Sequence, residues 1–317
     1  MRVPGLKSLH RLALWLRSRI VGGALILGYH RISVAPHDPY GLSVTPQHFA
    51  EQLEILSREA RPVRLQDLVR ARFEGRVPRR AVVLTFDDGY ADNLYQARPL
   101  LERYEVPATV FVCTGYAGRA FWWDEVAQIT KSGVPGEKSR ALDRALDGAQ
   151  RIEADGKALT WELYRQLLPL SLSERDRLLD RVRSWATSFS VPSDSHRALT
   201  DSELTKLFAD NLVAAGAHTV SHRPLGILQR QDQAAEILDS KVRLEELLGR
   251  PVSGFSYPNG SLCPETMQLV REAGFAYACA SHNDVAWRGS HVYCLPRFWV
   301  PDVDGDRFQR WLRRWIM

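Results

Sequence analysis

Two adjacent aspartates and a pair of histidines have the residue types and spacing that metal-assisted hydrolysis requires. Asp87 and Asp88 end an apolar run and precede a glycine, and His218 and His222 follow a second apolar run. Two neutral imidazoles and one carboxylate can hold a divalent metal ion while leaving positions open for water and a substrate oxygen. The spacing therefore predicts a site in which one aspartate and both histidines bind a single ion.

The second aspartate would then have a separate role. Neighbouring carboxylates repel each other unless a cation lies close to them. With an ion beside it, the spare aspartate is placed to take a proton from the bound water, whose pKa the ion lowers toward about 7. We expect His218 and His222 to lie on a helical turn, where side chains four residues apart face the same way. The simpler interpretations are a structural histidine pair and an ordinary turn at the aspartates.

Alternating strands and helices must bring these residues together. Apolar runs predict strands at 23–30, 81–86, 107–113, 212–215, 252–258, 275–280 and 293–300. Between them, amphipathic stretches predict helices at 45–59, 199–211, 231–249 and 264–273. This alternation is typical of an α/β protein with a mostly parallel sheet, open or closed into a barrel. Ligands bind at the carboxyl ends of such strands, so the aspartates and the histidines are expected to converge there.

Two segments depart from this alternation. Residues from about 120 to 199 are polar, poor in strand formers and helical in pattern, which predicts an all-helical insertion within a domain spanning 23–317. Residues 1–22 predict a basic amphipathic helix, which either packs on the domain or lies on a membrane surface through residues 1–20.

Composition excludes several classes of protein. The 317 residues carry a net charge of +5 with 45% hydrophobic residues, which is ordinary for a globular protein. The four cysteines form no C-x-x-C pair, which argues against a disulfide scaffold or a zinc knuckle. No nucleic-acid-binding pattern, signal peptide or membrane-spanning run is apparent. We therefore expect no nucleic-acid partner and a cytoplasmic location, at the inner face of the membrane.

Three motifs, in order, resemble those of the polysaccharide deacetylases, carbohydrate esterase family four. They are T-F-D-D-G-Y at 85–90, H-T-V-S-H at 218–222 and F-S-Y-P-N-G at 255–260. L-G-Y-H-R-I-S at 27–33 and L-P-R-F-W-V at 295–300 resemble the branch that acts on exopolysaccharides and poly-N-acetylglucosamine. The resemblance implies a deformed (β/α) barrel and metal-dependent removal of N-acetyl groups from a polysaccharide, oligosaccharide or lipid-linked glycan.

The resemblance also implies roles for individual residues. Asp87 would be the general base, and the metal ligands would be Asp88, His218 and His222. The ion would usually be Zn²⁺, with Co²⁺ or Ni²⁺ as substitutes. The backbone N–H near Asn259 would help to hold the oxyanion, and Tyr257 would shape the sugar pocket.

Two departures from the family pattern concern the base and the acid. Ser256 stands where many members have an arginine that steadies the base, so we expect Arg297 to reach that place; otherwise it makes a surface salt bridge. The late histidine that serves many members as general acid has no counterpart, and in the exopolysaccharide branch the acid comes from the N-terminal Y-H strand. His30 is therefore expected to be the general acid, titrating near neutral pH, unless it is a core histidine. Of Trp122 and Trp123, at most one is expected to stack on a sugar, and both can instead anchor the insertion.

Two other functions remain open from the sequence. The same fold and ion could cleave another non-peptide amide, such as a ureide or a formyl amide. The chain could instead be a non-catalytic relic that binds carbohydrate. Aromatic side chains around the pocket would favour an N-acetylated glycan as substrate, whereas a small closed pocket with a carboxylate-binding arginine would favour the other amides.

Overall fold

The computed structural model describes residues 23–131, 156–184 and 196–316. The predicted basic helix at 1–22 lies outside the described residues. No helix in the described ranges has the length and apolar character needed to cross a membrane.

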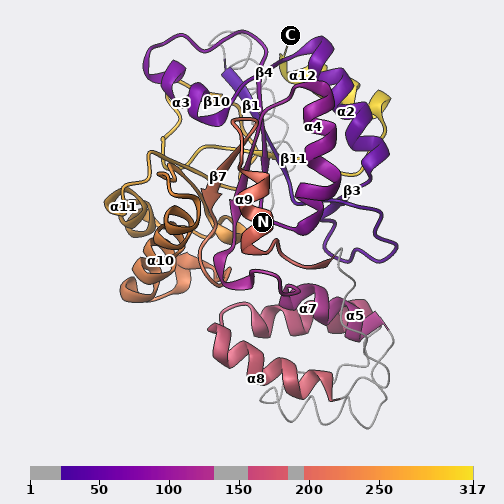
Figure 1. The fold of residues 1–317 in the computed structure, drawn as a ribbon, viewed down its shortest axis with the longest axis vertical. Coiled ribbons are helices and arrows are strands. Elements are labelled where there is room, and N and C mark those ends of the chain that lie inside the picture. Colours follow the sequence, from indigo (N-terminus) through magenta and orange to yellow (C-terminus); the bar gives the residue numbers. More distant parts are fainter. Residues whose placement is uncertain (1–22, 132–155, 185–195, 317) are drawn as a thin grey trace, which may run out of the picture.

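A mostly parallel sheet forms the centre of the molecule (Figure 1). Its main strands run in the order β10-β1-β5-β6-β7-β8-β9, and β1, β5, β6, β7, β8 and β9 pair in parallel along this path. The strands are β1 (Gly23–Tyr29), β4 (Arg61–Pro62), β5 (Ala81–Phe86), β6 (Ala108–Val112), β7 (Val213–Ala217), β8 (Gly254–Ser256), β9 (Tyr277–Cys279), β10 (Ala286–Trp287) and β11 (Phe298–Trp299). A separate pair joins β2 (Arg31–Ile32) to β3 (Ser43–Val44). The predicted parallel α/β architecture is confirmed.

The segment that leads into β11 joins the two sides of the sheet. Leu295 pairs in parallel with Cys279 at the end of β9, and β11 pairs in parallel with β1. Within a few residues, the chain therefore passes from the strand at one end of the sheet order, β9, back to β1. Arg297 lies in the middle of this closing segment, between the residue that pairs with β9 and the strand that pairs with β1.

The central strand β5 shows why the sequence forms this sheet. All six of its residues are buried, as expected for a parallel strand covered on both faces. Leu84 pairs with Leu27 of β1 on one side and with Ala108 of β6 on the other. The hydroxyl of Thr85, its polar member, donates to the Leu27 carbonyl at 2.9 Å. A buried β5 places Asp87 and Asp88 immediately beyond the end of the sheet.

The α-helices pack around the sheet and extend beyond one end of it. They are α2 (Pro46–Glu59), α3 (Leu65–Phe73), α4 (Arg98–Tyr104), α5 (Trp122–Lys131), α7 (Gly156–Leu167), α8 (Leu172–Arg183), α9 (Asp201–Leu207), α10 (Arg230–Leu248), α11 (Pro264–Glu272) and α12 (Gly305–Ile316). Local signals set their ends: the Thr45 side chain accepts from the His48 N–H at the start of α2, and Gly249 ends α10 in the left-handed conformation.

Helices α5, α7 and α8 gather at one end of the molecule, at the bottom of Figure 1. They share an apolar cluster separate from that of the sheet, including Trp122, Leu163 and Leu179. These helices fall in the stretch predicted as a helical insertion; residues 132–155 and 185–195 of that stretch lie outside the described ranges.

Candidate metal and catalytic site

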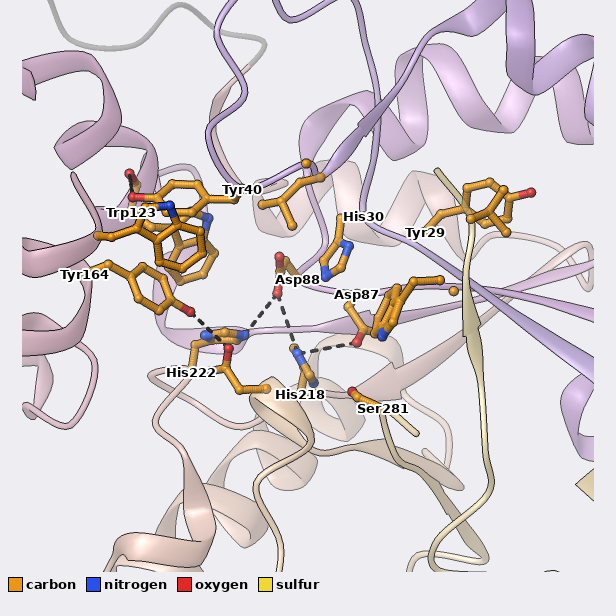
Figure 2. Close-up of a pocket in the computed structure, with 17 residues that line it drawn as sticks. Tyr29, His30, Tyr40, Asp87, Asp88, Trp123, Tyr164, His218, His222 and Ser281 are labelled. Atoms are coloured by element: carbon orange, nitrogen blue, oxygen red, sulfur yellow. Dashed lines mark hydrogen bonds and ion pairs between the residues drawn. The ribbon is translucent and has the colours of Figure 1, made fainter. Parts of the chain in front are cut away.

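A pocket of about 420 Å³ opens where the carboxyl ends of the parallel strands meet. Its lining includes His30 after β1, Asp87 and Asp88 after β5, and His218 and His222 after β7. Figure 2 shows Asp88 between the two imidazoles, with His30 nearby. The topology therefore brings the predicted metal ligands, base and acid into one cavity.

Asp88, His218 and His222 form a buried group whose ligand atoms lie within 4.8 Å of one another. Asp88 Oδ1 is 3.6 Å from His218 Nε2 and 3.4 Å from His222 Nε2. Within the described residues, this is the one cluster of three or more such side chains that could hold an ion. One carboxylate and two imidazole nitrogens are the donor set expected of a catalytic zinc site with open positions.

The two histidines converge from a loop, so the expected helical turn is wrong. Thr219 and His222 have φ values of 64° and 57°, in the left-handed region, where a helix cannot continue. The His222 N–H donates to the Thr219 hydroxyl at 3.0 Å. The carboxylate of Glu236 on α10 accepts hydrogen bonds from the backbone N–H groups of Val220 and Ser221. These contacts, rather than helical periodicity, turn both imidazoles toward Asp88.

The side-chain hydrogen bonds fit a metal ion at this position. His218 Nδ1 lies 2.7 Å from the Ser256 carbonyl, so the proton is on Nδ1 and the Nε2 lone pair faces Asp88. Asp88 Oδ1 is buried and has no hydrogen-bond partner. A buried carboxylate oxygen without a donor is costly, and a cation between Asp88 and the imidazoles would remove that cost.

Asp87 is held by Arg297 and Ser256. Arg297 Nη1 and Nη2 donate to the two carboxylate oxygens of Asp87 at 2.7 and 2.8 Å. The Ser256 hydroxyl accepts from Arg297 Nη2 at 2.8 Å and donates to Asp87 Oδ2 at 3.1 Å. Arg297 is 0% exposed, which excludes the surface salt bridge considered from the sequence. The closing segment of the barrel thus carries the arginine to the place next to Ser256.

The two aspartates have opposite pKa shifts. Burial alone would raise the pKa of Asp87, but the charge and hydrogen bonds of Arg297 outweigh it and hold that pKa well below its usual range. Burial raises the pKa of Asp88 well above its usual value, and the negative charge of Asp87 adds to this shift. Asp87 is therefore ionised with a partner, whereas Asp88 needs a cation to stay ionised.

His30 lines the pocket with its ring stacked on Trp299, the centroids 4.5 Å apart. Burial lowers the pKa of His30 to about 4, and the charge of Arg297 also lowers it, although Asp87 acts in the opposite direction. The expectation that His30 titrates near neutral pH is therefore wrong: its imidazole is neutral at pH 7. Its place in the pocket, next to Trp299, is not that of a core histidine.

The two residues predicted from the F-S-Y-P-N-G motif differ in position. Asn259 lines the pocket and has a φ of 55°. The Tyr257 side chain is buried away from the cavity, and its hydroxyl donates to the Tyr293 carbonyl at 2.8 Å. The prediction that Tyr257 shapes the sugar pocket is corrected, because the alternation of side chains past β8 turns its ring into the core against Phe255.

The two tryptophans of α5 differ in position: one is buried among the helices and the other lines the pocket. Trp122 is buried in the helical cluster, where its ring packs against Tyr164 with centroids 5.0 Å apart. Trp123 lines the pocket with its ring 4.6 Å from that of His222. Its Nε1 donates to the Tyr90 hydroxyl, which donates to Asp124. Trp122 is therefore an anchor of the helices, and Trp123 forms part of the pocket wall.

The sequence did not predict several residues around the site. Tyr40, Trp161 and Tyr164 line the pocket, and Figure 2 shows Tyr40 and Tyr164 on the side away from Asp87. The fully buried Arg175 of α8 donates to the Ser221 carbonyl, next to His222. A sequence pattern identifies each as a core or surface residue of a helix or loop, and none carries a motif that indicates its contact with the site.

Comparisons with known proteins place the sequence and the fold in context. Residues 74–137 and 176–278, more than half of the chain, match a family described as polysaccharide deacetylase. The Bacillus subtilis protein YxkH is 21% identical over 230 residues, and the matched part spans 55% of YxkH. A Staphylococcus aureus poly-beta-1,6-N-acetyl-D-glucosamine N-deacetylase is 21% identical over 309 residues, covering 92% of this chain and 82% of that protein.

Solved structures share the fold. The Streptococcus pyogenes deacetylase PplD superposes with a TM-score of 0.61 at 19% identity, covering 92% of this chain and 98% of PplD. IcaB from Ammonifex degensii also has a TM-score of 0.61, at 20% identity, with coverage of 92% and 97%. The predicted deformed (β/α) barrel is confirmed.

Proposed function

Because the chain belongs to the polysaccharide deacetylase family, we propose that it removes N-acetyl groups from a glycan with the help of a divalent metal ion. The family predicted from the motifs is confirmed, and so is the class of enzyme, a hydrolase of non-peptide carbon–nitrogen bonds. The observation that carries the proposal is that two adjacent aspartates in one pocket have different surroundings. Asp87 is clamped by Arg297, and Asp88 faces two imidazoles with an unpartnered oxygen.

Asp88, His218 and His222 would hold the ion, and Zn²⁺ is the ion we propose, with Co²⁺ or Ni²⁺ as substitutes. When bound, the ion would polarise the acetyl carbonyl and lower the pKa of the attacking water. The Ser256 carbonyl fixes the tautomer of His218, and the neighbouring Trp123 ring limits the rotation of His222. These residues orient the site before substrate arrives.

Asp87 would accept the proton of the attacking water. Its two hydrogen bonds from Arg297 keep the carboxylate ionised and fix the direction of its oxygens. The same bonds lower its basicity, so its value as a base comes from position more than from a matched pKa. Backbone N–H groups near Asn259, at the pocket wall, would stabilise the negative oxygen that forms on the acetyl carbon.

His30 would supply the proton that the departing amine needs. Because its pKa is about 4, the ring is neutral at pH 7 and must take up a second proton before it can act as an acid. The proton released from the attacking water would therefore pass to His30 and then to the amine; direct transfer from Asp87 is the alternative that His30→Ala tests. The balance closes: the water oxygen bonds to the acetyl carbon, the carbon–nitrogen bond breaks, the amine gains the proton, and acetic acid leaves.

The pocket favours a glycan over the other amides considered from the sequence. Its lining includes Tyr40, Trp123, Trp161, Tyr164 and Trp299, whose ring faces suit sugar rings. No arginine or lysine among the described residues lines the pocket, so nothing there is suited to bind the carboxylate of a ureide-type substrate. The complete set of base, ligands and neighbouring histidine also argues against a non-catalytic relic. The named activity of the S. aureus relative further supports N-acetylglucosamine as the sugar.

Release of acetate from N-acetylglucosamine oligosaccharides tests this function. We expect a chelator to abolish the activity and added Zn²⁺ to restore it. Asp87→Asn should lower kcat by about 10²–10⁴-fold, and His30→Ala should lower it by the same or a smaller factor, the range of one acid or base group. Activity that survives complete metal removal would contradict the proposal. If only His30→Ala has no effect, the assignment of the acid alone is lost.

The cytoplasmic location and a contact of residues 1–20 with the membrane remain predictions. The basic segment lies outside the described residues. Cell fractionation in low salt addresses both: recovery of the whole protein in the supernatant would contradict the membrane contact.

A further inference from the structure

Three aromatic rings meet in the lining of the pocket, and Figure 2 shows two of them, Tyr40 and Tyr164, on the side away from Asp87. Tyr40 lies 5.3 Å from both Trp161 and Tyr164, and Trp161 lies 5.6 Å from Tyr164, measured between ring centroids. We call these three residues the aromatic platform. We propose that the aromatic platform is a second sugar-binding subsite, which stacks on a neutral sugar next to the one that loses its acetyl group. This inference rests on the proposed function and specifies its substrate as a neutral chain.

The aromatic platform is continuous with the catalytic pocket. Tyr40, Trp161 and Tyr164 all line the same cavity as Asp88 and His222. The Tyr164 hydroxyl donates to Asn259 Oδ1 at 3.0 Å, and the Tyr40 hydroxyl donates to the Trp123 carbonyl at 3.3 Å. These bonds tie Tyr164 to the turn that carries Asn259 and Tyr40 to the start of α5, both of which border the candidate metal site. A sugar chain whose acetylated unit lies at that site would therefore meet the platform with an adjacent unit.

The exposure of Trp161 indicates a binding surface rather than a core position. Trp161 is 41% exposed, although it lies on the helix whose other aromatic, Tyr164, packs against the buried Trp122. A large ring left open beside a catalytic pocket is a typical mark of a binding surface. The electron-rich face of an aromatic ring attracts the weakly positive C–H groups on one face of a sugar.

The charge around the pocket defines the class of ligand. Among the described residues that line it, the charged ones are Asp87 and Asp88, and there is no lysine or arginine. Arg297 lies fully buried behind Asp87 and donates to both of its oxygens. Arg297 and the proposed ion would offset the two carboxylates, and the lining offers no lysine or arginine that could pair with a phosphate or diphosphate on the sugar. A neutral oligosaccharide needs no such partner.

The aromatic platform is a feature of this chain beyond the matched family sequence. Trp161 and Tyr164 fall between the two matched segments, 74–137 and 176–278, and Tyr40 precedes them. The family match thus accounts for Asp87, Asp88 and the histidines, but it says nothing about these rings. Specificity for a chain of sugars would arise from residues outside the match.

Chain-length dependence of catalysis tests the subsite. For Trp161→Ala we expect kcat/KM on an N-acetylglucosamine pentasaccharide to fall about tenfold, mainly through KM, as loss of one ring contact predicts. The loss on the N-acetylglucosamine monosaccharide, which has no adjacent unit to stack on the platform, should be much smaller. Trp161→Phe should recover most of the pentasaccharide activity.

A control is Phe73→Ala, which removes an aromatic ring outside the pocket that is more open than Trp161, 71% exposed against 41%. It should leave both substrates unaffected. Equal kcat/KM of Trp161→Ala and wild type on the pentasaccharide would overturn the inference, and so would an equal loss on both substrates. If the wild type releases acetate from neither substrate, the proposed function fails. Calorimetric binding of the pentasaccharide to wild type and Trp161→Ala then still decides whether the subsite exists.

A second comparison tests the neutrality of the ligand. Uridine diphosphate N-acetylglucosamine carries the same sugar on a diphosphate. We expect it to inhibit pentasaccharide hydrolysis at least about tenfold more weakly than the neutral disaccharide of N-acetylglucosamine, because no lysine or arginine of the pocket lining would pair with its phosphates. Equal or stronger inhibition would refute the assignment to a neutral chain.

Discussion

At the scale of single residues, strained backbone surrounds the pocket. Asp88, Thr219, His222 and Asn259 all have φ between 55° and 74°, in the left-handed region that residues other than glycine rarely adopt. Thr219 is β-branched, for which this conformation is especially unfavourable. Such strain persists where surrounding contacts fix it, as the side chain of Glu236 does beside Thr219. The strain turns Asp88 and His222 toward a common point.

The clamp on Asp87 gives a residue-scale prediction. Arg297→Lys keeps the charge but loses the two parallel hydrogen bonds, so we expect kcat to fall about 10–100-fold through a misplaced base. Zn²⁺ affinity should change little, because Arg297 contacts Asp87 and Ser256 rather than the metal-ligand group. Rates of acetate release and calorimetric titration with Zn²⁺ measure the two effects separately.

Ser256→Ala is the graded control for this clamp. It removes one hydroxyl contact to Asp87 and leaves both arginine bonds in place, so its effect on kcat should be smaller. A loss of Zn²⁺ affinity in Arg297→Lys as large as the loss of kcat would contradict the assigned role.

At the scale of elements, helix α8 supports the loop that carries His222. All five N–H donors of Arg175 are used. They bond to the carbonyls of Leu167, Leu168, Leu170 and Ser221 and to the Tyr116 hydroxyl, at 2.7–3.1 Å. Its guanidinium also lies over the Trp122 ring at 4.9 Å. One buried side chain thus joins α7, α8 and α5 to the residue next to a candidate metal ligand.

This bridge predicts that Arg175 affects metal binding without touching the metal. Arg175→Lys cannot reproduce the fork of five donors, so we expect Zn²⁺ affinity to fall about 10–100-fold, as is usual when the support of a ligand is lost. Arg177→Lys is the matched control, because Arg177 lies two residues away on α8 and its described hydrogen bond is an exposed one to the Ser173 carbonyl. Calorimetric titration measures the affinities, and circular dichroism checks the fold. An unchanged affinity in a folded Arg175→Lys protein would exclude the supporting role.

At the scale of the whole molecule, metal binding and stability are coupled. Without an ion, the raised pKa of Asp88 means that the folded state holds a proton more tightly than the unfolded chain. The stability of the metal-free protein should therefore fall as pH rises from about 3.9, the ordinary aspartate value, toward the folded pKa. A bound cation reverses this penalty by pairing with the carboxylate.

Asp88→Asn separates these two effects. The neutral side chain has no charge to bury, so the metal-free variant should be more stable than metal-free wild type by about 1–3 kcal/mol at pH 7. Zn²⁺ at 100 times its Kd should stabilise the wild type by about 2.7 kcal/mol and the variant far less. Chemical denaturation between pH 5 and 8, with and without Zn²⁺, gives both numbers. A variant less stable than metal-free wild type would show that Asp88 is not under electrostatic strain.

The sequence alone determined the elements and the chemistry at their ends. Buried apolar runs located the strands, and β5 occupies the predicted residues 81–86. Since parallel strands end at one edge, the residues after β5 and β7 could be predicted to meet. Residue types then indicated a metal site at Asp88, His218 and His222, because few other functions suit that combination.

Only the tertiary structure decided how the site is completed. The approach of Arg297 to Asp87 depends on the closing segment between β9 and β1, and the aromatic platform depends on how α7 packs against the loop that carries Tyr40. Local periodicity determines which residues are buried in an element, but it carries no information on which distant element they contact.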